Sequence, residues 1–130
     1  MIVLDASVVL EVILSTVVGR GLEPRLRAAG ESWHAPAVLD LEVTQVLRRL
    51  ARVRTLTSKR GAQAVADLAD LPIRRYPHLP FIHRVWSMRR NLTAYDAAYV
   101  ALAEELGAPL VTRDAKLAAA PGHRAVVELV

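Results

Sequence analysis

The feature that most constrains the fold of this chain is the alternation of short aliphatic runs with longer amphipathic segments. Met1–Leu4 and Pro109–Thr112 are apolar runs of strand length, whereas Val38–Arg54 repeats its apolar residues at helical spacing. Strands that are separated by helices pair in parallel through right-handed crossovers. The alternation therefore predicts an α/β fold, a three-layer α/β/α sandwich around a central parallel sheet of about four or five strands.

The expected elements can be placed along the whole chain, which we take as one domain over residues 1–130. Strands are predicted over residues 1–4, 32–36, 72–76, 109–112 and 125–129. Helices are predicted over residues 6–14, 23–29, 38–54, 57–71, 79–90 and 94–106, with a short helix or turn over 113–119. Thr57 or Ser58 and Thr93 are expected N-caps, and Gly107 is an expected C-cap.

Composition narrows the chemistry and the setting of the protein. The absence of cysteine excludes disulfides, thiolate metal sites and thiol catalysis, and it agrees with a cytoplasmic location, which we expect. No charge-free stretch is long enough to span a bilayer, and the first apolar run lacks the basic leader of a signal peptide. The net charge of +4 fits a polyanionic partner such as nucleic acid, or simply an arginine-rich soluble protein.

Two aspartates stand where predicted strands end. Asp5 directly follows the first aliphatic run, and Asp114 follows the run that ends at Thr112 after one residue. Both are therefore expected at the carboxyl ends of buried strands, the edge at which open α/β sheets bind ligands. Either residue taken alone has a second interpretation as a helix N-cap, a position that Asp fills well.

Two further carboxylates lie on or beside apolar helix stripes. Asp96 shares a predicted helix face with Tyr99, and Glu42 borders the apolar stripe of its helix. A charge in such a position is costly unless it is paired or bound to a metal. The alternatives are a first-turn Asp stabilised by the helix dipole, and a rim Glu paired with Gln45 or Arg49.

Together these four carboxylates predict a divalent metal site. Anions held close together repel one another, and a cation removes that repulsion. All-oxygen ligation favours Mg²⁺ or Mn²⁺ over zinc, which usually recruits His or Cys, and carboxylate-held Mg²⁺ characteristically serves phosphate chemistry. The histidines lack paired ligand spacing, and we expect each at the surface or at a helix end: His34, His78, His83 and His123.

The chain resembles the PIN-domain ribonucleases, specifically the VapC-type toxins of bacterial toxin–antitoxin pairs. The resemblance covers nearly the whole chain and rests on the segments IVLDASVVLE, PAVLDLEVTQVLRRL and NLTAYDAAYVALAEELGAPLVTRDAKL. The last segment is the most specific, because it combines a YDA helix start, a following strand and a T-x-D step in that order. The resemblance implies a PIN-like fold and a Mg²⁺- or Mn²⁺-dependent endoribonuclease that hydrolyses RNA phosphodiester bonds, leaving a 5′-phosphate and a 3′-hydroxyl.

The resemblance also implies roles for individual residues. The acidic quartet that binds one or two metal ions in the family is matched by Asp5, Glu42, Asp96 and Asp114. Ser7 and Thr112 match the small hydroxyl residues that support the quartet, and Asn91 falls near a polar position before the YDA helix. Gln45 stands where many relatives have Asn; because Gln still donates and accepts hydrogen bonds, we expect altered positioning rather than lost activity.

Three partners follow from the resemblance: an RNA substrate, a cognate VapB-type antitoxin and a second copy of the chain in a homodimer. Trp33, Phe81 and Trp86 are candidate anchors for protein contacts, or ordinary core residues. The basic residues either steer RNA phosphates or form solvated helix faces; they are Arg48, Arg49, Arg52, Arg54, Lys59, Arg60, Arg89, Arg90, Arg113 and Lys116.

Other functions remain as alternatives. The chain could be a catalytically silent PIN-like binding module, or a nucleic-acid-binding regulator that uses its arginine-rich helix and binds duplexes without metal. A haloacid-dehalogenase-type phosphatase fits poorly, because it needs an Asp where Ser7 stands. A receiver domain fits poorly too, because no strand-end Lys can be placed. Ser7 is not expected to be a triad nucleophile, since no histidine has an evident place beside it.

Overall fold

The computed structural model describes residues 1–130, and its frame is a parallel sheet with the strand order β3-β2-β1-β4-β5. The strands are β1 (Ile2–Leu4), β2 (Trp33–Pro36), β3 (Ile73–Tyr76), β4 (Leu110–Thr112) and β5 (Val127–Leu129). Every neighbouring pair is parallel, as the alternation of elements predicted. The chain adds β2 and β3 on one side of β1, and β4 and β5 on the other. The order of the strands therefore reverses between β1 and β4.

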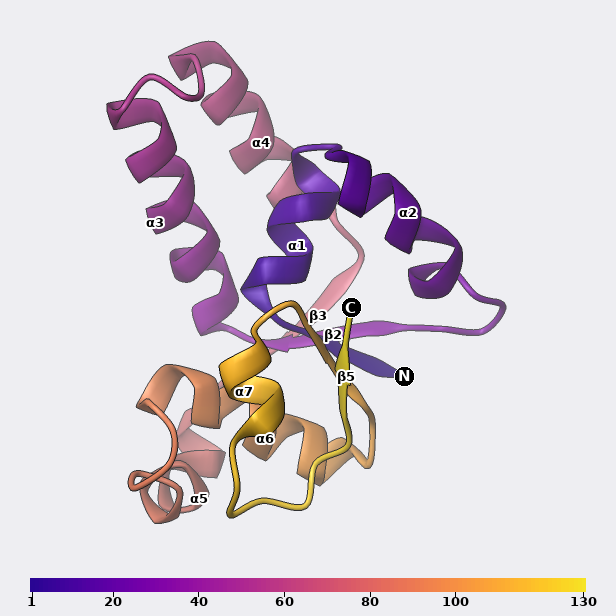
Figure 1. Ribbon diagram of the computed structural model, residues 1–130, viewed down its shortest axis with the longest axis vertical. Helices are drawn as coiled ribbons and strands as arrows, with labels where there is room; N and C mark the ends of the chain where they lie inside the picture. Colours follow the sequence, from indigo (N-terminus) through magenta and orange to yellow (C-terminus); the bar gives the residue numbers. More distant parts are fainter.

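Helices cover both faces of this sheet, which confirms the predicted α/β/α sandwich (Figure 1). On one face α1 (Ala6–Ile13) packs against α2 (Val17–Leu26), α3 (Val38–Arg52) and α4 (Ser58–Asp70). The other face carries the short 3₁₀ turn η1 (Leu79–Phe81), α5 (Ile82–Ser87), α6 (Ala94–Leu106) and α7 (Ala115–Ala119). Figure 1 shows α3 and α4 extending away from the sheet as a pair.

The core is aliphatic and centred on the two strands that flank the switch in strand order. Every residue of β1 and β4 is buried, because helices cover both sides of these strands. Helix α6 supplies a continuous buried segment from Ala97 to Ala103, in which Tyr99 is the largest fully buried side chain. No helix in the structure has both the length and the hydropathy that a membrane crossing requires.

Two predicted helices have different bounds in the structure. The helix predicted over residues 23–29 is wrong in extent, because α2 starts at Val17 and ends at Leu26. Its start is set by Thr16, whose hydroxyl accepts a hydrogen bond from the Gly19 amide at 2.9 Å. The helix predicted over 79–90 begins as a 3₁₀ turn and stops at Ser87, where the Met88 amide bonds to the carbonyl three residues before it.

The predicted caps fall where the sequence placed them. Thr57 is the N-cap of α4 and accepts from the Arg60 amide at 3.1 Å. Thr93 is the N-cap of α6 and accepts from the Asp96 amide at 3.2 Å. Gly107 ends α6 with a left-handed φ of 59°, a conformation that glycine adopts without steric cost. The N-cap Thr93 and the C-cap Gly107 thus set the start and the end of α6.

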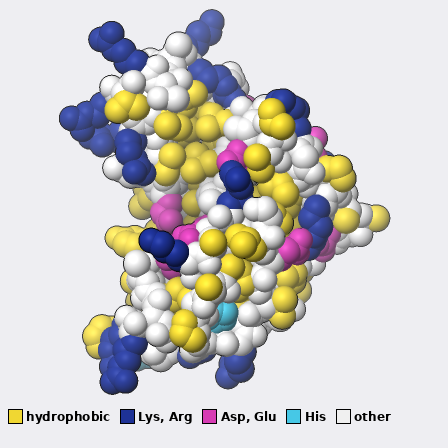
Figure 2. Space-filling view, in the orientation of Figure 1, with side chains coloured by type: hydrophobic (Ala, Val, Ile, Leu, Met, Phe, Trp, Pro, Cys, Tyr) yellow, Lys and Arg dark blue, Asp and Glu magenta, His cyan; other side chains and the backbone are white.

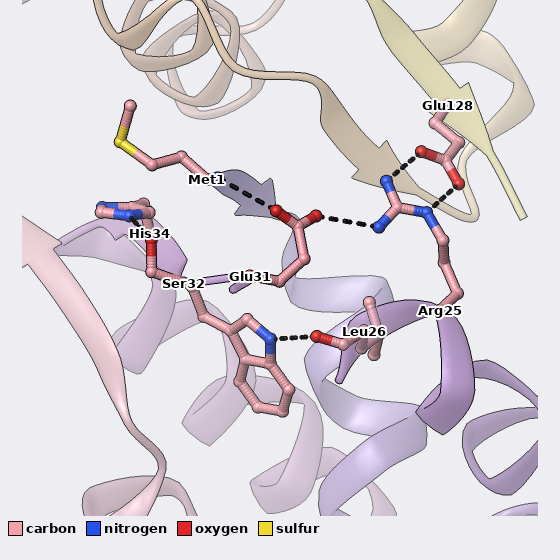
Figure 3. A network of polar contacts seen from close by, with 8 residues as sticks. Met1, Arg25, Leu26, Glu31, Ser32, His34 and Glu128 are labelled. Carbon is pink, nitrogen blue, oxygen red and sulfur yellow. Dashed lines mark hydrogen bonds and ion pairs between the residues drawn. The ribbon is translucent and has the colours of Figure 1, made fainter. Parts of the chain in front are cut away.

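An ion-pair network links α2 to the last strand (Figure 3). The guanidinium of Arg25 donates to both carboxylate oxygens of Glu128 on β5, at 2.9 and 2.7 Å. Its third nitrogen donates to Glu31 at 3.0 Å, and Glu31 also accepts from the amino group of Met1. Hydrogen bonds from this amino group and from Arg25 lower the pKa of Glu31. The groups are partly exposed, so each pair contributes about 1 kcal/mol or less.

The three aromatic candidates for interface anchors lie in different environments. Trp33 is a core residue, because its ring is buried and its indole N–H donates to the Leu26 carbonyl at 2.7 Å. Phe81 packs half-buried against the core. Trp86 is 66% exposed, with the Arg89 guanidinium over its ring at 4.5 Å. Of the three side chains, only that of Trp86 is exposed to solvent and available to a partner.

Candidate active site

Asp5 follows β1 and is held by hydrogen bonds to both of its carboxylate oxygens. As N-cap of α1, it accepts from the Ala6 amide at 2.8 Å through Oδ1. Its Oδ2 accepts from the hydroxyls of Ser7 at 2.6 Å and Thr112 at 2.7 Å. Asp5 is only 6% exposed, so these donors replace the water that burial removes from its carboxylate. Asp5 therefore has a fixed orientation at the carboxyl edge of the sheet.

Thr112, the last residue of β4, connects the two strand-end carboxylates. Its hydroxyl donates to Asp5 and accepts from the Asp114 amide at 3.0 Å. Asp114 caps α7, because its Oδ1 accepts from the amides of Lys116 and Leu117 at 2.8 and 3.3 Å. The N-cap interpretation and the strand-end interpretation are thus both correct for Asp5 and Asp114. In each residue the capping hydrogen bonds occupy Oδ1, and the residue still lines the cavity at the edge of the sheet.

Asp96 comes to the same edge from α6, on the opposite side of the sheet from α1 and α3. It lies in the first turn of the helix and is half-buried. Burial raises its pKa, and the charges of Asp5 and Asp114 raise it further, while the Thr93 hydroxyl lowers it. Negative charges that interact in this way must lie near one another. Asp96 therefore belongs to the same electrostatic cluster as the two strand-end residues.

Glu42 reaches the cluster from α3 and lacks the partners that an ordinary surface Glu would have. It forms no ion pair with Arg49 and no hydrogen bond with Gln45, and its buried Oε1 has no hydrogen-bond partner. Burial raises its pKa to about 7, with further contributions from the charges of Asp5 and Asp96. Glu42, the predicted site residue with the weakest sequence signal, is thus the one that its surroundings stabilise least as an anion.

One cavity of about 630 Å³ brings these carboxylates together at the switch between β1 and β4. Figure 2 shows acidic side chains in the hollow between the α3–α4 end of the molecule and the part that carries α5 and α6. The residues that line it include the four carboxylates and several polar neighbours: Asp5, Ser7, Glu42, Gln45, Arg49, Thr93, Tyr95, Asp96 and Asp114. An acidic, oxygen-rich cavity at this edge is chemically suited to a divalent cation.

The carboxylates share the cavity without forming a closed cage. No group of three or more His, Cys, Asp or Glu side chains is close enough to hold a single ion in this arrangement. Asp5 and Asp114 are restrained by their capping hydrogen bonds, whereas Oε1 of Glu42 is not bound to any protein group. Convergence on one ion would therefore require side-chain rotation, which is open to Glu42 and Asp96 because neither residue caps a helix.

Two sequence predictions around the site are not supported by the geometry. Asn91 does not line the cavity; it is exposed and lies against Gly122, because the chain turns away between α5 and α6. The expectation that every histidine lies at the surface or at a helix end is wrong for His34. That residue is buried in β2, where its ring nitrogens bond to the hydroxyls of Ser32 and Tyr76, both at 2.8 Å. Burial lowers the pKa of His34.

The basic residues have different relations to the cavity. Arg49 lines it, and Arg113 lies at the start of α7, where it pairs with Glu11 while its amide donates to Ser7. On the face drawn in Figure 2, Lys and Arg side chains project from both ends of the molecule, and others lie between them. The expected steering role thus has one immediate candidate in the cavity wall, which is Arg49.

One residue near the site was not singled out from the sequence. Tyr99 lies one turn after Asp96 on α6 and is fully buried, and its hydroxyl has no hydrogen-bond partner of ordinary geometry. Burial and the charges of Glu42, Asp5 and Asp96 raise its pKa. The available signal was the shared helix face of Asp96 and Tyr99, but an aromatic residue on a buried face usually indicates only core packing.

Comparison with known sequences gives matches over nearly the full chain. A PIN-domain family model matches residues 2–122. Ribonuclease VapC12 of Mycobacterium tuberculosis is 45% identical over 130 residues, which cover 100% of this chain and 99% of that protein. Ribonuclease VapC9 of the same species is 42% identical over 117 residues, or 90% of this chain and 88% of that protein.

Solved structures have the same fold at much lower sequence identity. VapC20 of Mycobacterium tuberculosis, described as a Sarcin-Ricin loop cleaving toxin, superposes with a TM-score of 0.68 at 16% identity, covering 92% of this chain and 94% of that one. VapBC2 of Rickettsia felis, bound to a promoter DNA fragment, superposes with a TM-score of 0.71 at 14% identity, covering 99% and 98%. At such identities these structures establish the common architecture.

Proposed function

Because the chain belongs to the PIN-domain family, and within it to the VapC ribonucleases, we propose that it is a metal-dependent endoribonuclease acting as the toxin of a toxin–antitoxin pair. The observation that carries this proposal is the single cavity to which two strand ends and two helices each contribute one carboxylate. Residues that lie far apart in the sequence thus supply one acidic site at the edge of the sheet where α/β proteins bind ligands. The proposed reaction is hydrolysis of RNA phosphodiester bonds.

The donor set fits Mg²⁺ or Mn²⁺. It consists of carboxylate oxygens without sulfur or imidazole, and Glu42 offers a buried oxygen that no protein group satisfies. The residues that would hold the ion are Asp5, Glu42, Asp96 and Asp114. A bound divalent ion supplies Lewis acidity at the phosphodiester and makes water a stronger nucleophile. Its positive charge would also stabilise the ionised forms of Asp96 and Glu42 against burial and, to a smaller extent, against the mutual repulsion, which together raise their pKa values.

The protein groups around the cavity have separable tasks in this proposal. Asp5 provides a pre-oriented carboxylate, because three donors hold it. Arg49, in the cavity wall, provides a positive charge for the RNA backbone. Ser7 orients Asp5 rather than acting as a nucleophile, since its hydroxyl donates to that carboxylate and accepts from the Arg113 amide. No histidine lines the cavity, so a Ser–His mechanism has no base there.

We also propose a VapB-type antitoxin and a homodimer as the physiological assembly. The antitoxin is supported by solved relatives that are toxin–antitoxin complexes, among them one from Klebsiella pneumoniae with a TM-score of 0.63 at 19% identity, covering 92% of this chain and 91% of that one. Exposed apolar side chains are available for such contacts, including Trp86 at 66% and, beside the cavity, Leu41 at 73%. Co-purification of the chain with its antitoxin and light scattering of the toxin alone test these two proposals.

The decisive experiment measures RNA cleavage by purified protein with Mg²⁺, with Mn²⁺ and with a chelator. We expect cleavage only with metal, and we expect Asp5→Asn and Asp96→Asn each to reduce it at least a hundredfold. Glu42→Gln should have a comparable effect. The matched control is Asp40→Asn on the same helix, because Asp40 lies outside the cavity and pairs with Arg75 at 3.0 Å.

Two results would contradict the proposal. Unchanged cleavage by the Asp5→Asn protein would remove the assigned site. RNA binding without cleavage in either metal would make the chain a catalytically silent binding module. Mapping the cut ends in cellular RNA after controlled expression would then identify the substrate of an active enzyme, and growth inhibition that disappears with Asp96→Asn would support the toxin role.

A further inference from the structure

Tyr99 has a buried hydroxyl that the fold does not satisfy. Its side chain is 0% exposed, and its oxygen makes no hydrogen bond of ordinary geometry within the protein. An unpaired buried hydroxyl destabilises the folded state relative to a paired one, so a phenylalanine would serve packing alone at least as well. The hydroxyl therefore needs another explanation than the stability of α6.

An explanation for the Tyr99 hydroxyl comes from Glu42, which reaches the edge of the sheet from its other face. Glu42 on α3 also has a buried oxygen without a partner, and the Tyr99 hydroxyl is close enough to the Glu42 carboxylate to lower the pKa of that group. The Tyr99 hydroxyl can donate a hydrogen bond, whereas the Glu42 carboxylate, when ionised, can only accept one. Two unsatisfied groups of complementary character thus lie near each other, Tyr99 on α6 and Glu42 on α3, and Glu42 lines the acidic cavity.

We propose that Tyr99 is a positioning residue: its hydroxyl donates a hydrogen bond to the ionised Glu42 carboxylate and holds it ready for a divalent ion. This inference rests on the proposed metal site. Oε1 of Glu42 has no other partner in the protein, whereas caps fix Asp5 and Asp114 and the Thr93 hydroxyl interacts with Asp96. Asp96 lies one turn before Tyr99 on the same helix, so α6 supplies one carboxylate directly and orients another across the cavity.

A second tyrosine allows a purely structural role to be separated from a positioning role. The Tyr76 hydroxyl bonds to Nδ1 of His34 at 2.8 Å and does not line the cavity. Tyr76→Phe therefore removes one phenolic oxygen and one hydrogen bond of ordinary geometry, away from the carboxylates. We expect this variant to have a lower melting temperature and wild-type affinity for metal.

The experiment titrates Mn²⁺ alone into chelator-treated, full-length protein by calorimetry. The variants are Tyr99→Phe, Tyr76→Phe, Glu42→Gln and the double variant of positions 99 and 42. We expect Tyr99→Phe to weaken Mn²⁺ binding about tenfold, the loss of one charge-assisted hydrogen bond. We expect no additional weakening in the Glu42→Gln background, because Tyr99 acts through Glu42. The melting temperature of metal-free Tyr99→Phe should not be lower than that of the wild type.

The outcomes distinguish the inference from the function on which it rests. Wild-type Mn²⁺ affinity in Tyr99→Phe, or an equal loss in the presence and absence of Glu42, would overturn the role of Tyr99 and leave the metal site intact. A wild-type protein that binds no Mn²⁺ would overturn the metal site and this inference together. The positioning role is supported if Tyr99→Phe weakens Mn²⁺ binding only when Glu42 is present and leaves the melting temperature unchanged.

Discussion

At the scale of single residues, Thr112 has the most connected position in the site. Its side chain is 0% exposed, and its hydroxyl donates to Asp5, 107 residues away, while accepting from the Asp114 amide. Thr112 thereby joins the ends of two neighbouring strands through one oxygen atom. A hydroxyl can do this because it is both donor and acceptor, which no apolar residue of the same shape can be.

We expect Thr112→Val to lower the free energy of unfolding by about 1–3 kcal/mol, because it removes one of the two donors to the buried Asp5 Oδ2 and leaves the Asp114 amide without its acceptor. RNA cleavage should fall as well, since Asp5 loses one of its restraints. Chemical denaturation and cleavage assays measure the two effects. Thr112→Ser keeps the hydroxyl and is the control; if it behaved like the Val variant, the loss of a methyl group rather than of the bond would be responsible.

Glu42 predicts a specific dependence of stability on pH. Its pKa in the folded, metal-free protein is about 7, above the ordinary value of 4.5 for Glu, mainly because of burial. The folded state therefore holds a proton that the unfolded state has lost, and the resulting stability is present below pH 4.5 and disappears as the pH rises through 7.

In the presence of a chelator, we therefore expect Glu42→Gln to melt at a higher temperature than the wild type at pH 8, with the difference shrinking toward pH 4.5. Gln has no proton to lose, so its protein lacks this component of the pH profile. Differential scanning calorimetry across this range checks the expectation. Glu105→Gln, an exposed change on α6, controls for the loss of a charge. Parallel profiles for the wild type and Glu42→Gln would contradict it.

At the scale of elements, the contact between α1 and α2 depends on a single glycine. A Cβ at Gly19 would lie 2.1 Å from the backbone oxygen of Glu11, so the two helices approach as closely as their backbones allow. Backbone atoms cannot move aside as a flexible side chain can. Since Asp5 caps α1 and Ser7 lies in its first turn, this contact also supports the segment that carries these two site residues.

Gly19→Ala should therefore lower the free energy of unfolding by about 2–3 kcal/mol, because it forces α1 and α2 apart. Gly21 lies on the same helix, where an added Cβ would meet nothing within 4 Å. Gly21→Ala should raise the free energy of unfolding by about 0.5–1 kcal/mol through helix propensity. Urea denaturation of both variants gives the comparison, and equal effects at the two positions would show that helix propensity, not close packing, dominates.

At the scale of the whole molecule, the candidate site belongs to no single element. Its carboxylates come from the ends of β1 and β4 and from α3 and α6, which lie on opposite faces of the sheet. An ion held by all of them would link both helical layers to the sheet. Ligand that binds only the folded state stabilises it as a whole, by about 2.7 kcal/mol at a hundred times its dissociation constant.

Saturating Mn²⁺ should accordingly raise the melting temperature of the wild type by about 5–10 °C over that in chelator. We expect Asp96→Asn to lose most of this increase, whereas Asp40→Asn, whose carboxylate lies outside the cavity, should retain it. Thermal unfolding followed by circular dichroism is sufficient. An equal increase in both variants would mean that the ion binds somewhere other than the proposed site.

The sequence by itself determined the local features of this protein. Aliphatic periodicity located β1 and β4, the helix caps Thr93 and Gly107 fell at the predicted positions, and Asp5 and Asp114 had to follow strands. These features depend on neighbours within a few residues, whose propensities and spacing are read directly along the chain. The family resemblance rested on the same local motifs.

Only the tertiary structure decided which of these features meet. It placed β1 between β2 and β4, buried His34 and left Asn91 outside the cavity. It also brought the hydroxyl of Tyr99 on α6 close to the carboxylate of Glu42 on α3. Each outcome depends on contacts between residues that are distant along the chain, and the energies of such contacts arise from burial and pairing in the packed molecule, which local sequence patterns do not contain.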